Sequence, residues 1–324
     1  MQNIETVLKK ILILLTATLL LAACSSDSDT SVTNDGRRVA LQVTGYIADT
    51  PHGITRAHGT SWEAGDQIGL YAVNSNKTTP IDDGSNVCYS TTSGGETAGS
   101  TFLLFTTSTP IILPATGDID VYGYYPYSSG ATNPTAVAVN VSTQNLQKNI
   151  DLMTAGKVST STHNGSTPIS INEPSCELLF QHRLTKLVFN LTFNDFGVIN
   201  NTSLTIGSQK TTATYNIYTD ILTYGSGEAN QTITAAVGST KSGFDKTFEA
   251  IVLPNDADNN PAVDCKVTIV VDGGSYSFTI IRTGAATNNT VLTGPFAAGC
   301  KYEYNVTVYP FTIIVDTDKY TEQW

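Results

Sequence analysis

Residues 265–281 read CKVTIVVDGGSYSFTII, and this stretch decides the fold class. Two runs rich in β-branched and aromatic residues, Cys265–Val271 and Ser275–Ile281, lie on either side of Asp272-Gly273-Gly274. Short runs of this composition that end in Gly, Asn, Asp or Pro are typical of β-strands. The stretch therefore predicts two consecutive strands joined by a turn.

Similar runs recur along the chain and predict further strands at 39–46, 67–73, 101–105, 119–125, 135–141, 187–193, 213–218, 247–253 and 302–308. Helical periodicity is scarce, and regular short strands with turns between them favour β-sandwiches over a parallel α/β sheet. Loop-like sequence at 159–168 and 172–175 separates two series of strands. We predict an all-β protein with two tandem β-sandwich domains, residues 39–175 and 176–310.

The N-terminal segment has the pattern of a secretory signal. Lys9 and Lys10 precede an apolar run of 13 residues, Ile11–Ala23, which is shorter than the roughly 20 residues that span a bilayer. Small residues directly before Cys24 resemble a lipobox, where a bacterial lipoprotein is lipidated on cysteine and cut just before it. We predict a lipoprotein signal peptide at 1–23, with an ordinary signal peptide as the alternative.

A polar, acidic stretch at 24–38 follows and predicts a flexible tether. The whole chain carries 17 basic and 28 acidic residues, a formal net charge of −11. Because phosphate binding requires clustered Lys and Arg, nucleic acid is excluded as a partner. The lipid on Cys24 would anchor the precursor to the outer membrane.

Residues suited to chemistry do not assemble into a known motif. The four cysteines after Cys24 allow two disulfides in any of three connectivities, or they are buried thiols: Cys88, Cys176, Cys265 and Cys300. The four histidines lack metal-binding spacing, and an incomplete calcium-loop pattern at 256–267 favours a solvated turn. We therefore predict no catalytic residues, no metal, no cofactor and no enzymatic activity.

The run YGYYPY at 122–127 offers two interpretations. Aromatic faces pack against sugar rings, so a platform for a glycan or host protein would use Tyr122, Tyr124, Tyr125 and Tyr127. Alternation along a strand would instead bury half of these side chains, which makes a packed strand end the preferred interpretation.

Several stretches together resemble the fimbrillin-like family, the type V pilins. They are TRAHGTSWEAGDQIGLY (55–71), YYPY (124–127), LFQHRLTKLVF (179–189), EAIVLPN (249–255) and GCKYEYNVTV (299–308), in this order. The resemblance implies two transthyretin-like sandwiches, lipoprotein export to the cell surface and assembly with other pilin subunits into a pilus. It also implies that an Arg-specific protease removes an N-terminal strand, which the C-terminal strand of another subunit replaces.

The residues give this mechanism a physical basis. Val39, Leu41 and Val43 alternate on one face of a strand that precedes Arg56, so cleavage between Arg56 and Ala57 would release it and expose an apolar edge. Cutting at Arg37 or Arg38 would leave the strand in place.

At the other end of the chain, residues 311–324 are a candidate donor strand. Pro310 ends the preceding strand, and the apolar side chains of Phe311, Ile313 and Val315 then recur at every second position, between Thr312, Ile314 and Asp316. The alternative is an edge strand that folds back on its own domain. A shaft subunit, a tip subunit and a surface lipoprotein that binds a ligand without polymerising all stay open.

Overall fold

Strands form almost all of the regular structure in the described part of the chain. The structure is a computed structural model, and it describes residues 38–48, 61–94, 102–225, 231–255, 263–281, 290–292, 295–316 and 320–323. A short 3₁₀ helix at Gln147–Asn149 accompanies the strands. The predicted all-β class is confirmed.

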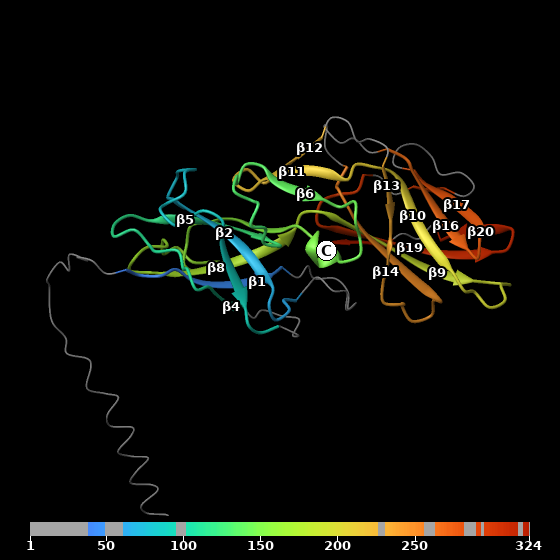
Figure 1. Ribbon diagram of the computed structural model, residues 1–324, viewed down its shortest axis with the longest axis horizontal. Helices are drawn as coiled ribbons and strands as arrows, with labels where there is room; N and C mark the ends of the chain where they lie inside the picture. The colour runs from blue at the N-terminus through green and yellow to red at the C-terminus, as the bar shows by residue number, and fades with distance from the viewer. Residues whose placement is uncertain are drawn as a thin grey trace, which may run out of the picture. The chain divides into compact units, whose positions relative to one another are not determined.

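Seven strands close into a barrel in the order β1-β4-β3-β2-β5-β7-β8 (Figure 1). Their bounds are β1 Gln42–Ile47, β2 Gln67–Asn74, β3 Val87–Thr91, β4 Leu103–Thr106, β5 Ile119–Tyr125, β7 Met153–Val158 and β8 Ser175–His182. All neighbours pair antiparallel except β1 and β8, which run parallel. The barrel contains a core built around Trp62, Phe105 and Phe180.

Two larger sheets contain most of the remaining strands. One has the order β13-β10-β16-β17-β18, with bounds Gln231–Thr234, Thr202–Gln209, Cys265–Val271, Gly274–Ile281 and Thr290–Leu292. The other has the order β14-β15-β9-β19-β20, with bounds Ala236–Val237, Lys246–Val252, Thr185–Phe193, Cys300–Tyr309 and Thr312–Val315. β21, Tyr320–Gln323, also pairs with β19. Side chains from both sheets share one core, as expected for a sandwich.

A third, small sheet joins the two series of strands. It has the order β12-β11-β6, with bounds Ile221–Tyr224, Thr212–Asn216 and Val137–Asn140. β6 precedes residue 175 and β11 follows it, yet they pair from Thr212↔Asn140 to Tyr215↔Val137. Contacts therefore join residues 38–324 into one compact unit, and the two tandem sandwich domains stay a prediction.

The chain passes from the barrel to the second sheet shortly after residue 175, and the domain boundary near that residue stays a prediction. β8 begins at Ser175 and closes the barrel against β1 and β7, whereas β9 begins at Thr185 in the second sheet. The chain changes sheets between His182 and Thr185. Residues 175–182 are not among the strands predicted from the sequence, and no local pattern indicates which strands β8 pairs with.

Burial on both faces distinguishes β2 and β5 from the other barrel strands. On β5, Val121 and Tyr125 face the barrel core, while Tyr122 and Tyr124 belong to the core shared with the sandwich. A strand covered on both sides shows no polar alternation. Among the described residues, no helix has the length and apolar character needed to cross a membrane.

Candidate functional site

The first strand of the barrel closes a gap between β4 and β8. Its alternating burial places Leu41, Val43 and Ile47 inside the barrel core, while Gln42 is exposed, and Val39 packs partly buried against the same core. The sequence predicted this shared face for Val39, Leu41 and Val43. The period-two pattern fits because only one face of β1 is covered.

Backbone hydrogen bonds hold β1 along both edges. Val43 faces Phe105 of β4 in the antiparallel ladder, and the parallel ladder with β8 runs from Gln42↔Ser175 to Ile47↔Phe180. The Leu41 N–H donates to the Ile111 carbonyl at 2.9 Å. β1 is therefore an interior strand whose loss would leave two strand edges without partners.

Three aromatic residues pack around Gly45 of β1. The Trp62 indole N–H donates to the Gly45 carbonyl at 3.2 Å. Its ring packs edge to face on Phe105 at 5.1 Å and on Phe180 at 5.2 Å between centroids. Sequence reasoning missed Trp62 and Gly45 as site residues, although a glycine inside an alternating strand signals a close approach.

The residues expected at the processing sites lie outside the part of the chain that the structure describes. These are Cys24, Arg56 and Ala57. The described chain ends at Ala48 and resumes at Ser61, so Arg56 lies between β1 and Trp62 in sequence. A cut there would leave Trp62 with the barrel and separate it from β1.

The C-terminal residues fold back as an edge strand, which was the alternative to a free donor. β20 pairs antiparallel with β19 from Tyr309↔Thr312 to Val306↔Val315, and β21 continues along the same strand. Ile313 is buried and Val315 half-buried, but Phe311 lies in the turn before β20 and is 99% exposed. Phe311 therefore does not share the buried face of Ile313, because the tight turn after Pro310 precedes the strand.

The tyrosine run does not form an exposed platform. Tyr122, Tyr124 and Tyr125 are each at most 6% exposed, and only Tyr127 is half-buried. Burial raises the pKa of Tyr124 to about 12, although a hydrogen bond donated by the Ser128 N–H partly opposes the increase. The interpretation of these residues as a packed strand end agrees with this burial; a sugar-stacking surface does not.

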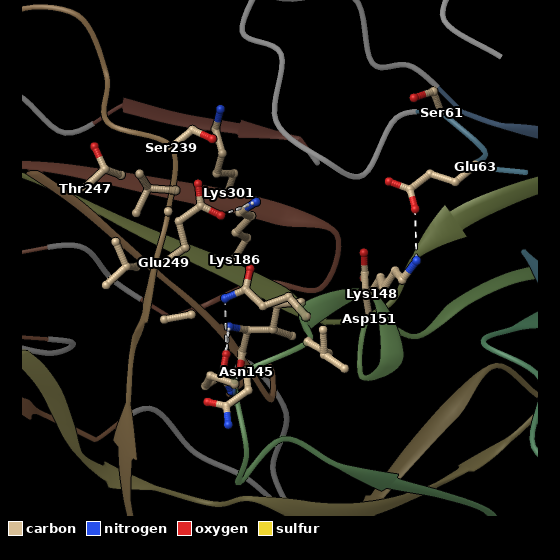
Figure 2. A pocket seen from close by; sticks show the side chains of 18 of the residues that line it. Ser61, Glu63, Asn145, Lys148, Asp151, Lys186, Ser239, Thr247, Glu249 and Lys301 are labelled. Carbon is tan, nitrogen blue, oxygen red and sulfur yellow. Dashed lines mark hydrogen bonds and ion pairs between the residues drawn. The ribbon is translucent and has the colours of Figure 1, made fainter. Parts of the chain in front are cut away.

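A cleft of about 750 Å³, lined by both charged and apolar side chains, lies beside the outer face of the β15-β9-β19 sheet. Lys186 Nζ pairs with Glu249 Oε2 at 2.8 Å, and Lys148 Nζ pairs with Glu63 Oε2 at 2.9 Å (Figure 2). The Lys186 side chain is only 2% exposed, so its charge requires this partner. The paired groups compensate each other and leave no arrangement that resembles a nucleophile with its base.

The pKa shifts of the titratable groups near the cleft are explained mainly by burial. Burial raises the pKa of Asp66, and a backbone hydrogen bond from Glu63 opposes it. Burial also raises the pKa of the Tyr125 hydroxyl. Among the described residues, no group of three or more His, Cys, Asp or Glu could hold a metal ion.

The cysteines belong to the strands. Cys88 on β3 and Cys176 on β8 are free thiols, and burial raises the pKa of both. Cys265 is buried on β16, and Cys300 is half-buried at the start of β19.

Comparison with known proteins places this geometry in a family. A model of fimbrillin-like proteins matches residues 55–324. The chain belongs to the fimbrillin-like family. A relative named "Putative fimbrium subunit Fim1C" from Bacteroides uniformis is 31% identical over 303 residues, which cover 91% of this chain and 88% of the relative.

Solved structures have a similar fold. The fimbrillin-like chain is similar to the crystal structure of "a putative cell adhesion protein" from Bacteroides uniformis, with 28% identity, a TM-score of 0.64, and coverage of 89% of this chain and 99% of that one. A second such protein, from Bacteroides ovatus, has 19% identity, a TM-score of 0.65 and coverage of 89% and 98%; it shares the fold.

Family membership fixes the broad role of the protein. It is a fimbrial subunit, not an enzyme, because fimbrillins are structural subunits. Its place is the fimbriae of the cell surface, and other pilin subunits are its partners.

Proposed function

We propose that this fimbrillin-like chain is a shaft or tip subunit of an adhesive fimbria that is exported as a lipoprotein and assembled by protease-triggered donor-strand exchange. Lipidation of Cys24 would anchor the precursor to the outer membrane. An Arg-specific protease would then cut between Arg56 and Ala57. The segment that carries β1 would leave, and a strand from another subunit would take its place.

The position of β1 carries the proposal. Leu41, Val43 and Ile47 are each at most 3% exposed, and burying such side chains contributes about 1.5–3 kcal/mol apiece. Removing β1 would expose these apolar sites together with the unpaired edges of β4 and β8. A new strand would restore both the backbone hydrogen bonds and the apolar contacts, which is the strand-addition mode of recognition.

The C-terminal strand is the donor in this proposal. β20 and β21 lie along one edge of β19 and follow all other strands in the sequence. Ile313 and Val315 supply the apolar side chains, and exposed Phe311 and Ile314 flank them. Donation would require β20 to separate from β19, so the folded-back strand represents the subunit before assembly.

The experiment follows the chain into fimbriae in its native bacterium. We expect the Arg56→Ala variant to reach the cell surface with β1 still attached and to be absent from isolated fimbriae. The matched control, Arg38→Ala, removes an arginine whose cleavage would spare β1, and it should assemble normally. N-terminal sequencing of the assembled chain should begin at Ala57.

Two results would contradict the proposal. Arg56→Ala chains found in fimbriae in normal amounts would show that this cut is not required. Assembled wild-type chains that retain residues 39–48 would show that β1 is not displaced. Deleting residues 311–324 should separately block addition of the next subunit.

A further inference from the structure

The apolar surface that β1 covers, which we call the groove, is formed by side chains of the barrel core. At the position of Gly45 this groove is shallow. A Cβ atom built on Gly45 would lie 2.8 Å from Phe105 Cε2 and 3.5 Å from Phe180 Cε2. Real Cβ atoms do not approach ring carbons as closely as the shorter of these distances, so even alanine requires the Phe105 ring to shift. A larger side chain would overlap both rings, and overpacking of this kind opposes insertion of a strand.

Neighbouring rings hold Phe105 and Phe180 in place. Trp62 packs edge to face against both of them, and also against Tyr125 at 5.4 Å between centroids. Trp62, Phe105 and Phe180 are at most 4% exposed. Interiors packed to this degree leave rings little room to move, so the floor of the groove at Gly45 is fixed.

The four rings of this cluster all follow Arg56 in the chain, so they would remain with the barrel once β1 had left. They belong to Trp62, Phe105, Tyr125 and Phe180. The incoming strand would therefore meet the same shape that β1 meets now. The incoming strand must therefore place apolar side chains at the positions now held by Leu41, Val43 and Ile47, and a very small residue at the position of Gly45.

We infer that this groove accepts its donor strand from a different fimbrial subunit and not from a second copy of this chain, because it requires a small residue at the position of Gly45. The C-terminal sequence from Tyr309 to Trp324, YPFTIIVDTDKYTEQW, contains no Gly, Ala or Ser. In the best apolar alignment, Phe311 and Ile313 fill the first two sites and Val315 falls on the shallow position. The inference deepens the proposed function and rests on it.

The expected partner is defined by chemistry. It is a fimbrillin-like subunit whose donor strand has the pattern apolar-x-apolar-x-small-x-apolar, where the small residue is Gly, Ala or Ser. Shifting the register of this chain's own strand by two residues brings Ile313 or Thr317 to the shallow position, and both are β-branched. No register of the C-terminal strand therefore supplies the required pattern.

The test uses the uncut chain, so that it does not depend on cleavage at Arg56. In one variant, residues 41–47 are replaced by a copy of residues 311–317, which brings valine to position 45. In the matched control, the same copy keeps the native glycine at position 45. Amide hydrogen exchange across β4 and β8 reports whether the inserted strand closes the barrel.

We expect exchange in β4 and β8 to be about 10- to 100-fold faster in the first variant than in its glycine-retaining control, as overpacking predicts. Equal protection of the two variants would overturn the inference, whether both are protected or both are open. A failure of the proposed function appears separately, as normal assembly of Arg56→Ala chains.

Discussion

Among the side chains that contact β1, Trp62 should contribute most to holding β1 in the barrel. The residue sits beneath Gly45, donates its indole N–H to the Gly45 carbonyl at 3.2 Å, and packs edge to face on Phe105 and Phe180. The substitution Trp62→Phe keeps an aromatic ring but removes the hydrogen bond and the second ring of the indole.

The magnitude follows from these two losses. A hydrogen bond of this kind contributes about 1 kcal/mol net. Trp62 is 4% exposed, so truncating its ring leaves a cavity that costs about 1–2 kcal/mol, less than the roughly 3–5 kcal/mol of a change to alanine. Trp62→Phe should therefore lower the free energy of unfolding by about 2–3 kcal/mol, or the unfolding midpoint by about 3–5 °C for a unit of this size.

The assay is urea and thermal unfolding of the chain that begins after Cys24, with far-UV circular dichroism as the signal. Leu104→Ala on the outer side of β4 is the matched control, because Leu104 is 57% exposed, and it should change stability by less than about 0.5 kcal/mol. A Trp62→Phe protein within about 0.5 kcal/mol of the parent would refute the reasoning.

Two further predictions concern Asp120 and the C-terminal strand. Burial alone would raise the pKa of Asp120, but hydrogen bonds from the Asn76 N–H and Lys157 outweigh burial and lower this pKa. The ionised Asp120 carboxylate therefore stabilises the folded state above about pH 4, and this contribution is lost as pH falls through the folded-state pKa. Asp120→Asn should cost about 2 kcal/mol at pH 7, and urea titrations at several pH values should show this difference shrinking in acid; a constant difference would contradict it. Ile313→Ala should cost about 2–3 kcal/mol in urea unfolding, whereas Phe311→Ser should cost less than about 0.5 kcal/mol, because Ile313 is 4% exposed and Phe311 is 99% exposed; equal effects would argue against the folded-back strand.

The sequence located about half of the strands and missed others, among them the barrel strands β3, β7 and β8. β16, Cys265–Val271, matches the predicted run residue for residue, and the buried face of β1 is the one that the alternation of Val39, Leu41 and Val43 predicted. These features depend on local periodicity and turn chemistry, which neighbouring residues determine. The sequence also carried the motifs that resemble the family, and the comparisons confirmed that membership.

The sequence failed where a partner strand is far away along the chain. β1 pairs in parallel with β8, more than a hundred residues later, and no local pattern states which strand lies beside which. For the same reason, no local pattern shows that the chain passes from the barrel to the second sheet between His182 and Thr185.

Tertiary packing also decided what individual side chains do. The alternation along β5 predicted that half of its tyrosines would be buried, but a second core on the outer face buries Tyr122 and Tyr124 as well. Sequence alone located about half of the strands and pointed to the family, because these depend on composition and local order. Only the tertiary structure placed Gly45 against Phe105 and Phe180, because the shape of a groove is set by rings that the fold brings together from separate strands.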